Sequence, residues 1–526
     1  MAMNCKKIAQ AMEPNTIVLV ICPLTSIIGD QIKEGESLGL KSVTLDEFLK
    51  ASDRDTHQVV FASAEQVLSK PFTEVLKDRS SRLHNALELV VVDESHTVEM
   101  WTGKRCKNAK SFRTAYGDLS ILRSLCKEGT PVLALTGTAD NHTREVIMCG
   151  LAINSDALEV FLSPNRTNLR INVIKTTKKD ALSNLDWLVE LCRRKQSETP
   201  ETILFCNTMK DVATVTNYLM LKLGSFAYIP PTSRESEDCL IGIYHSMSWD
   251  NYKDRIVSQL KSNGKVRLVV ATTALSMGVN FPDIRYIINW GPARNLLDHH
   301  QEAGRAGRDG KQSDIVVIYH GQQLTHCEDE VKSFVKSTSC LRVASYSAFD
   351  PNIKPLEPGH DCCSNCLTLC KCNMDECIVD PLPFGNAPTE IPKQQQITRP
   401  VSEYDKAVLY SALLELRESQ SISGSCPFDK TLISHGFSVE LIQDVVERCN
   451  EIFSVEDIIS SFPVFALVHA ITILEVFQEI FDDIPNYDDM QLPILNTDIT
   501  DQLVNYCGYF DIQTLIVMNL NWKYNS

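Results

Sequence analysis

Short apolar runs alternate with helically spaced stretches along the first part of the chain. Residues 16–21 (TIVLVI), 88–92 (ELVVV) and 131–135 (PVLAL) are rich in aliphatic, mostly β-branched side chains and end in polar or glycine-containing turns. Helical spacing follows them, for example over 143–149. Continuously apolar strands between helices predict a parallel sheet that is covered on both faces. Functional side chains are then expected in the loops after the carboxyl ends of the strands.

The same rhythm restarts after residues 165–172. Strands of a second parallel sheet are predicted at 202–206, 266–271, 286–290 and 315–319. Residues 379–400 are rich in Pro and Gln and predict a linker. Beyond the linker, the spacing is helical and the exterior is acidic over 402–420, 436–450 and 463–482. The predicted fold is therefore α/β, with two parallel-sheet lobes at 1–160 and 161–335. A cysteine-rich module follows at 336–378, a linker at 379–400 and an acidic, mostly helical C-terminal segment at 401–526.

Composition narrows the class of protein. The chain has 526 residues, which at about 100–200 residues per domain corresponds to two to four domains. Hydrophobic residues make up 44% and charged residues 22%, which excludes a disordered, collagen-like or coiled-coil chain. No stretch approaches the roughly 20 uncharged apolar residues of a membrane span, so no membrane partner is expected. The first 15 residues contain no apolar signal core, so secretion is not expected either.

The formal net charge of −16 is concentrated at one end of the chain. Residues 401–526 carry 20 acidic and 5 basic side chains, whereas residues 1–400 carry 47 acidic and 46 basic ones. The first 400 residues therefore remain free to bind a polyanion through local basic grooves. The acidic segment should repel DNA, and we interpret it as a segment for protein interaction or for packing against the rest of the chain.

The sequence VVVDESH at 90–96 places two carboxylates and a histidine at the carboxyl end of an apolar strand. In nucleotide hydrolysis, one carboxylate holds Mg²⁺ and a second orients or deprotonates the attacking water. Asp93 and Glu94 suit these two roles, and His96 suits a link between the nucleotide and the neighbouring lobe. The alternative is a strand end whose acidic side chains cap the next helix.

The sequence QEAGRAGRDG at 301–310 follows a predicted strand and a short helix. Arg305 and Arg308 are three residues apart and are predicted to face one side of a helix. Arginines supplied by a second lobe can neutralise the charge that develops on a transferred phosphoryl group. The alternative is a solvated helix with surface ion pairs.

Eight of the 19 cysteines fall between Cys327 and Cys377. In a chain without a secretion signal, such a dense cluster predicts a metal site rather than disulfides. Four thiolates, enough for a closed tetrahedral Zn²⁺ site of structural type, come from Cys340, Cys362, Cys363 and Cys366. The ligand set stays open, because further candidates are Cys370, Cys372 and Cys377. The alternative is a group of buried cysteines without a metal.

Over roughly residues 15–370, these motifs resemble the RecQ family of superfamily 2 DNA helicases. Residues 93–96 match the family's DEAH box, with Ser95 in place of Ala, and residues 301–310 match motif VI. Motifs Ia, III, IV and V have counterparts at 20–31, 135–139 (LTGTA), 205–208 and 271–282. Two further positions depart from the family pattern: Gly137 replaces the usual alanine of motif III, and Asn280 stands where Asp is common in motif V. The cysteine arrangement, with its vicinal pair, is similar to that of the family's zinc-binding module.

The resemblance implies two RecA-like lobes that hydrolyse ATP with Mg²⁺ while single-stranded DNA passes with 3′-to-5′ polarity. It implies catalytic roles for Asp93, Glu94, His96, Arg305 and Arg308. Nucleotide and Mg²⁺ contacts are implied for Asp93, Glu94, Gly278, Asn280, Gln301, Arg305 and Arg308. Contacts with single-stranded or duplex DNA are assigned to Pro23, Ser26, Trp101, Lys104, Arg105, Arg113, Asn207, Thr208 and Thr272.

The family carries an aromatic-rich loop between its DEAH box and motif III, which couples DNA binding to hydrolysis. The corresponding stretch here is 99–116 (EMWTGKRCKNAKSFRTAY), whose central residues depart from the family pattern. Its aromatic side chains suit stacking on unpaired bases, and its basic ones suit neutralising phosphates: Trp101, Phe112 and Tyr116, with Lys104, Arg105, Lys107, Lys110 and Arg113. The alternative is a basic surface loop over a helix.

The family's phosphate-binding loop, which is Gly-rich and ends in Gly-Lys-Ser or Gly-Lys-Thr, has no counterpart before residue 20. The first lobe is therefore expected to be incomplete at its N-terminus. The predicted function is a RecQ-like ATP-dependent 3′–5′ DNA helicase of repair or recombination, in the nucleus by resemblance and otherwise in the cytoplasm. The alternative is a non-catalytic DNA-binding or scaffold protein that does not hydrolyse ATP.

Overall fold

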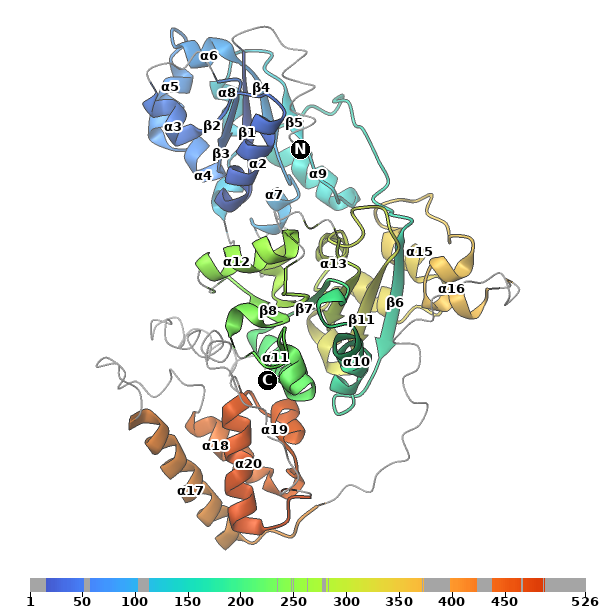
Figure 1. Cartoon of the computed structure of the whole chain (residues 1–526). Helices are drawn as coiled ribbons and strands as arrows, with labels where there is room; N and C mark the ends of the chain where they lie inside the picture. The colour runs from blue at the N-terminus through green and yellow to red at the C-terminus, as the bar shows by residue number, and fades with distance from the viewer. Residues whose placement is uncertain are drawn as a thin grey trace. The chain divides into compact units, whose positions relative to one another are not determined.

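The computed structural model describes residues 16–51, 57–102, 113–370, 372, 398–422, 438–464 and 467–487, apart from positions 234, 247, 249, 263, 277–280, 282 and 486. The chain divides into two compact units, each with its own parallel sheet (Figure 1). The first unit comprises Met1–Arg166 with Ser345–Lys354, and the second comprises Thr167–Ala344 with Pro355–Ser526.

The first unit contains a five-stranded sheet with the order β2-β3-β1-β4-β5. All neighbouring strands are parallel, and their bounds are β1 (Ile17–Ile21), β2 (Ser42–Thr44), β3 (Val59–Ala62), β4 (Leu87–Val92) and β5 (Val132–Ala134). The central strands are buried almost throughout, because their aliphatic side chains are covered on both faces. The described helices of this unit are α2 (Thr25–Ser37), α3 (Leu45–Lys50), α4 (Ala64–Val67), α5 (Lys70–Lys77), α6 (Arg82–Ala86), α7 (Thr97–Met100), α8 (Ile121–Leu125) and α9 (Asn141–Gly150).

Local capping determines where two of these helices begin. The Thr44 hydroxyl accepts a hydrogen bond from the Glu47 amide, and the Glu47 carboxylate accepts one from the Thr44 amide. Ser63 and Gln66 make the same reciprocal pair at the start of α4. Each pair satisfies amides that have no partner within the helix, so α3 and α4 begin directly after β2 and β3.

The second unit contains a six-stranded parallel sheet with the order β6-β11-β10-β7-β9-β8. The predicted strands correspond to β7 (Thr202–Cys206), β9 (Leu268–Ala271), β10 (Tyr286–Trp290) and β11 (Ser313–Tyr319). The two outer strands, which the hydrophobic pattern did not predict, are β6 (Leu169–Lys175) and β8 (Ile241–Tyr244). The longer helices that follow these strands are α10 (Asp186–Lys195), α11 (Met209–Leu223), α12 (Asp250–Lys261), α13 (Leu296–Ala303) and α14 (Asp329–Val335).

The cysteine-rich module is attached to the edge of this second sheet. It contains α15 (Leu341–Tyr346), the 3₁₀ turn η9 (Gly359–Asp361) and α16 (Ser364–Thr368), and Figure 1 shows α16 beside β6. The Ile171 amide of β6 donates to the carbonyl of Cys362 at 3.3 Å. Arg342 is fully buried and donates to the carbonyls of Leu169 and Cys362. A backbone hydrogen bond and the buried Arg342 side chain therefore fix the module on the sheet.

The acidic C-terminal segment packs against the second lobe. Its described helices are α17 (Glu403–Ile422), α18 (Val439–Glu447), α19 (Val455–Ser461) and α20 (Leu467–Phe481), and they share one hydrophobic core with α10 and α11. On α11, the Asn217 side chain donates to the carbonyl of Val464 at 3.2 Å, and Lys222 forms an ion pair with Glu456 at 2.5 Å. None of the described helices has the length and apolarity needed to cross a membrane.

Candidate nucleotide, DNA and metal sites

The DESH sequence directly follows strand β4. The Asp93 amide donates to the carbonyl of Ile21, and the Ser95 amide donates to the carbonyl of Leu135. Between them, Glu94 has a φ of +46°, a left-handed conformation that costs a non-glycine residue about 1–3 kcal/mol and that the surrounding structure must hold in place. The hydrogen bonds to both neighbouring chain segments do so, and they place both carboxylates at the carboxyl edge of the sheet.

The carboxylates of Asp93 and Glu94 differ in how far they are buried. Burial, and then the charge of the adjacent Glu94, raise the pKa of Asp93 to about 7. The Glu94 side chain is 42% exposed and is therefore accessible to water. A divalent cation would favour the ionised form of Asp93, and carboxylate oxygens are the ligands that Mg²⁺ prefers. The donor chemistry of this strand end fits Mg²⁺.

His96 contacts its own lobe. Its side chain is 2% exposed, and its Nδ1 lies 3.1 Å from Thr136 Oγ1 and 3.4 Å from Glu94 Oε2. Burial lowers the pKa of His96 to about 4, so the ring is neutral at neutral pH. Thr136 Oγ1 donates to the carbonyl of Thr138 at 2.7 Å, so it accepts from Nδ1 of His96. Within the first lobe His96 therefore joins the DESH sequence to Thr136, and its link to the neighbouring lobe stays a prediction.

Thr136 is a residue that our sequence reasoning did not assign. It lies in the LTGTA sequence, which the resemblance to motif III singled out only as a segment. The structure shows that its hydroxyl joins this segment to the DESH sequence. Both motifs are visible in the sequence, but His96 and Thr136 are 40 positions apart, so their spacing does not predict the contact.

The QEAGRAGRDG sequence departs from its predicted geometry. Helix α13 ends at Ala303, before both arginines, and the chain turns at Gly307, where φ is +54°. Arg305 is 6% exposed, whereas Arg308 is exposed. The prediction that Arg305 and Arg308 face one side of a helix is wrong, because the chain has left the helix before it reaches them.

Asn168 and Glu302 hold this loop in place. The Asn168 amide group donates to the carbonyls of Gly307 and Lys311, both at 2.8 Å. Glu302 is buried and accepts a hydrogen bond from Nδ2 of Asn289 at 2.5 Å. Burial raises the pKa of Glu302 well above its usual range, which favours a neutral carboxylic acid. Gln301, the first residue of the motif, lies on α13 and is half-buried.

Three predicted DNA contacts lie together in the second lobe. Asn207 and Thr208 follow β7, and Thr272 follows the adjacent strand β9. Asn207 donates to the carbonyl of Pro292 at 2.9 Å, and Thr208 accepts from the Asp211 amide at 3.1 Å as the N-cap of α11. The first two side chains are exposed and Thr272 is partly exposed. Parallel pairing of β7 and β9 thus brings all three to one edge of the sheet.

The predicted DNA contacts of the first lobe are placed differently. Trp101 is 8% exposed, packs edge-on against the buried Tyr116 at 5.1 Å, and lies beneath the guanidinium of Arg113. Arg113 forms an ion pair with Glu65 and donates to the carbonyl of Pro23. We therefore revise the assignment of Trp101 and Arg113 to DNA, because the ring is packed in the core and the positive charge is paired within the lobe.

The remaining predicted residues of this set have no described side chain, or are buried. Pro23 is buried after β1, and Ser26 lies in the first turn of α2, where only the backbone is described. The other residues that the sequence analysis assigned to DNA, nucleotide or metal lie outside the described part of the chain: Lys104, Arg105, Lys107, Lys110, Phe112, Gly278, Asn280 and Cys377.

The cysteine-rich module brings together the four thiols predicted for zinc. The Sγ atoms of Cys340, Cys362, Cys363 and Cys366 all lie within 4.8 Å of one another. The Cys363 sulfur accepts hydrogen bonds from the amides of Leu341 and Cys366, both at 3.4 Å. Hydrogen bonds from neighbouring thiols lower the pKa of Cys363, which favours its thiolate. A closed set of four sulfur ligands, held by backbone amides, fits Zn²⁺.

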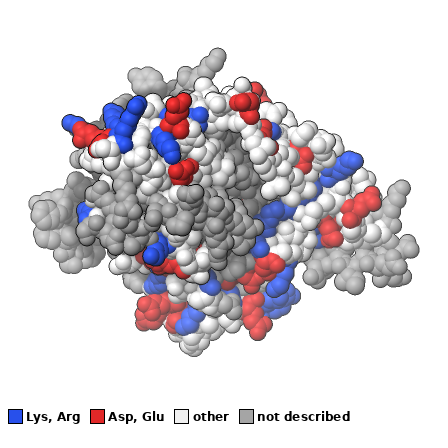
Figure 2. Space-filling view, turned by 90° about the horizontal axis from the view of Figure 1, so that it is seen from above, with Lys and Arg blue, Asp and Glu red and all other residues white. Residues whose placement is uncertain are grey.

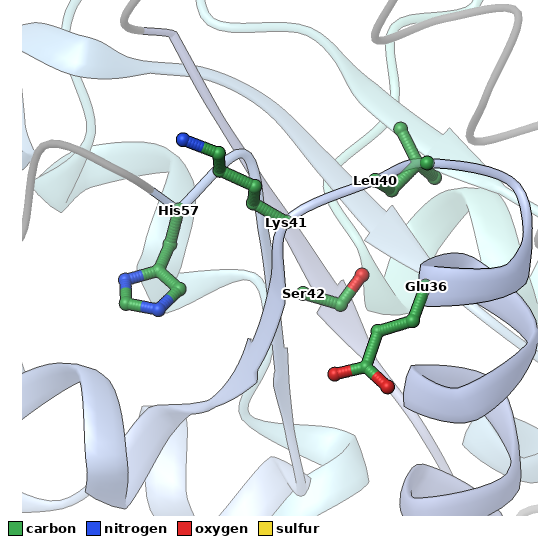
Figure 3. A pocket seen from close by; sticks show the side chains of 6 residues that line it. Glu36, Leu40, Lys41, Ser42 and His57 are labelled. Carbon is green, nitrogen blue, oxygen red and sulfur yellow. The ribbon is translucent and has the colours of Figure 1, made fainter.

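A separate hollow lies at the other edge of the first sheet. It has a volume of about 520 Å³, is open to solvent and is lined by Glu36, Gly39, Leu40, Lys41, Ser42 and His57 (Figure 3). Ser42 begins β2, and His57 precedes β3, so the hollow lies at the amino ends of these strands. Because all strands are parallel, it is at the opposite edge from the DESH sequence and is not part of the candidate nucleotide site.

The chain is similar in sequence to known helicases. Residues 183–310 match the family model described as "Helicase conserved C-terminal domain". The chain is 28% identical over 389 residues to the ATP-dependent DNA helicase Q-like 2 of Arabidopsis thaliana, covering 68% of this chain and 50% of the relative. It is 27% identical over 393 residues to the ATP-dependent helicase wrn-1 of Caenorhabditis elegans, covering 69% of this chain and 34% of that protein.

Among solved structures, the helicase Lhr of Mycobacterium smegmatis bound to ssDNA and AMP-PNP aligns with a TM-score of 0.45 at 16% identity, covering 68% of this chain and 45% of that one. The chain thus spans half or less of the length of these three proteins.

Two parallel α/β lobes, with a DESH sequence at a strand end of the first and QEAGRAGRDG in the second, agree with the arrangement that the resemblance to superfamily 2 helicases implies. The relatives confirm the resemblance to the RecQ-like DNA helicases of that superfamily.

Proposed function

We propose that this chain forms the core of a RecQ-like ATP-dependent DNA helicase, which moves 3′ to 5′ and unwinds duplex or junction DNA in repair or recombination. The observation that carries the proposal is the strand end of the first lobe. There the sheet fixes a partly buried Asp93 beside Glu94, whose side chain is 42% exposed, and the Thr136 hydroxyl joins His96 to the LTGTA sequence. Nuclear location follows from the same resemblance, with the cytoplasm as the alternative.

In this proposal, each side chain has a distinct task. Asp93 holds Mg²⁺, which neutralises charge on the phosphates of ATP. Glu94 orients and deprotonates the attacking water, and its exposure of 42% leaves it accessible to that water. The second lobe supplies Arg305 and Arg308 to the phosphates, with Gln301, Gly278 and Asn280 as further nucleotide contacts. Zn²⁺ bound by the four clustered thiols stabilises the module on β6.

We further propose that single-stranded or duplex DNA contacts the exposed edge formed by Asn207, Thr208 and Thr272. On the face drawn in Figure 2, the basic side chains of the described residues are interspersed with acidic ones. Together with the near-balance of charge in residues 1–400, this favours binding through local groups rather than through one broad basic surface. A protein partner would use the outer, acidic faces of the C-terminal helices, because their apolar faces pack in the core of the second unit.

Substitution of Glu94 tests the catalytic assignment. In a chain supplied with the family's phosphate-binding loop, the Glu94→Gln variant should lose DNA-stimulated ATP hydrolysis by about 10²–10⁴-fold, because it removes the general base, and should still bind a fluorescent ATP analogue. Glu88→Gln is the matched control, because Glu88 lies on the same strand and is paired only with Lys127 at the surface in the described structure. Unchanged hydrolysis in Glu94→Gln would contradict the assignment.

The alternative is a DNA-binding or scaffold protein without ATP hydrolysis, and the same preparations distinguish it. A helicase should change its affinity for DNA when ATP is added, and should unwind a duplex with a 3′ tail but not one with a 5′ tail. Salt-sensitive DNA binding that ATP leaves unchanged would favour the alternative.

A further inference from the structure

A second cluster of metal-binding side chains lies next to the four clustered thiols. It consists of His360, Cys370 and Cys372, whose ligand atoms all lie within 4.8 Å of one another. Nδ1 of His360 is 3.4 Å from the Cys370 sulfur and 3.7 Å from the Cys372 sulfur, and the two sulfurs are 3.3 Å apart. The three donors therefore form a compact triangle.

The size of this triangle matches a tetrahedral zinc ion. With Zn–S bonds of about 2.3 Å and Zn–N bonds of about 2.0–2.1 Å, two ligand atoms of one ion lie about 3.5–3.8 Å apart. Each of the three measured separations is within a few tenths of an ångström of that range. We propose that His360, Cys370 and Cys372 bind a second Zn²⁺ ion, with the fourth position left to an exchangeable ligand such as water.

The local fold explains why a histidine and two cysteines ten or more residues apart meet. His360 lies in η9, and Cys370 follows α16, with its amide bonded to the carbonyl of Leu367. The two elements approach so closely that a Cβ on Gly359 would lie 2.8 Å from the carbonyl oxygen of Cys366. Glycine at 359 thus permits η9 to pack on α16, which carries its histidine to the cysteines that follow the helix.

The first site does not need these three ligands. Its four sulfurs are enough to surround one tetrahedral ion, so Cys370 and Cys372 are not required as alternatives within it. The second set is also well suited to zinc, because imidazole with two thiolates is a borderline-soft donor set. His360 is 12% exposed, and its other ring nitrogen lies 3.9 Å from a carboxylate oxygen of Asp361.

Metal content of the full chain tests the proposal. Zinc per chain, measured by elemental mass spectrometry, should be two in the unsubstituted protein and one in the Cys370→Ala/Cys372→Ala double variant. The matched control is Cys149→Ala, an exposed cysteine of the first lobe, which should retain two. His360→Ala should lose one ion, whereas His360→Cys should keep both because a thiolate replaces the imidazole. Circular dichroism of each variant establishes that it is folded.

Several outcomes would overturn the second site. One zinc ion in the unsubstituted chain would do so, as would two ions in the folded double variant. A folded double variant without any zinc would mean that Cys370 and Cys372 serve a single shared site. A disulfide between these cysteines, seen as the loss of two hydrogens in the intact mass together with one bound ion, would show that the pair is a redox couple instead. None of these results depends on ATP hydrolysis or DNA binding.

Discussion

The Asp93→Asn substitution should stabilise the first lobe, and the gain should depend on pH. Burial raises the pKa of Asp93 from 3.8 to about 7, so the fold favours the protonated carboxyl group. Its contribution to stability is therefore complete below the ordinary Asp pKa and is lost as the pH rises toward 7. Asparagine has no charge to bury, so the variant does not lose this contribution.

The magnitude follows from the two pKa values. Relative to a side chain that does not titrate, the raised pKa of Asp93 lowers the free energy of unfolding by about 2 kcal/mol at pH 5, where only the unfolded chain is ionised, and by about 4 kcal/mol at pH 8; both are upper limits because water relaxes around the charge. The variant should therefore be more stable than the unsubstituted chain, by a margin that increases over this range. Under the proposed function, the gain in stability should be accompanied by loss of Mg²⁺-dependent ATP hydrolysis, as expected where a buried charged group serves function.

Hydrogen exchange measures this effect within the first lobe. The free energy of opening of the β4 amides, compared between the two proteins at several pH values, reports the margin directly. Strand β10 of the second unit is the internal control and should be unchanged. A difference in β4 that stays constant from pH 5 to pH 8, or that favours the unsubstituted chain at pH 8, would refute the reasoning.

Two further substitutions test contacts that the structure revealed. Thr136→Val keeps the shape of the side chain but removes the hydroxyl partner of buried His96. The free energy of opening of the β4 amides should fall by about 1–3 kcal/mol, and ATP hydrolysis should slow. The control is Thr102→Val, which removes a hydroxyl elsewhere in the lobe. Arg399→Met removes a guanidinium that is 6% exposed and paired twice with Asp483, whose side chain is 33% exposed, and should destabilise the C-terminal helices by about 1–3 kcal/mol; full protection of α20 in exchange would contradict this.

Local patterns predicted much of the candidate site. Strands β4, β7, β9, β10 and β11 could be read from runs of aliphatic side chains, because a strand covered on both faces has no polar alternation. The carboxylates then had to lie at a strand end, since they follow the run directly. The vicinal cysteine pair and the spacing to Cys366 likewise predicted the thiol cluster that the structure brings together.

Predictions that depended on helical phase or exposure were less successful. Arg305 and Arg308 have the spacing of one helix face, yet α13 ends at Ala303, because a turn at Gly307 held by Asn168 replaces the last helical turn. Trp101 has the side chain of a base-stacking residue, yet it is packed in the core under Arg113. A sequence shows which groups are available but not which partner each one finds.

The sequence by itself therefore determined the alternation of strands and helices, the strand-end carboxylates and the supply of thiols, since each depends on neighbouring residues in the chain. Only the tertiary structure decided that His96 bonds to Thr136 and that the acidic helices pack on α11. It also decided that His360 lies beside Cys370 rather than beside the thiol of Cys362, which is nearer along the chain. The physical reason is that each of these contacts joins separate elements, whose pairing is set by how the sheets and helices pack rather than by spacing along the chain.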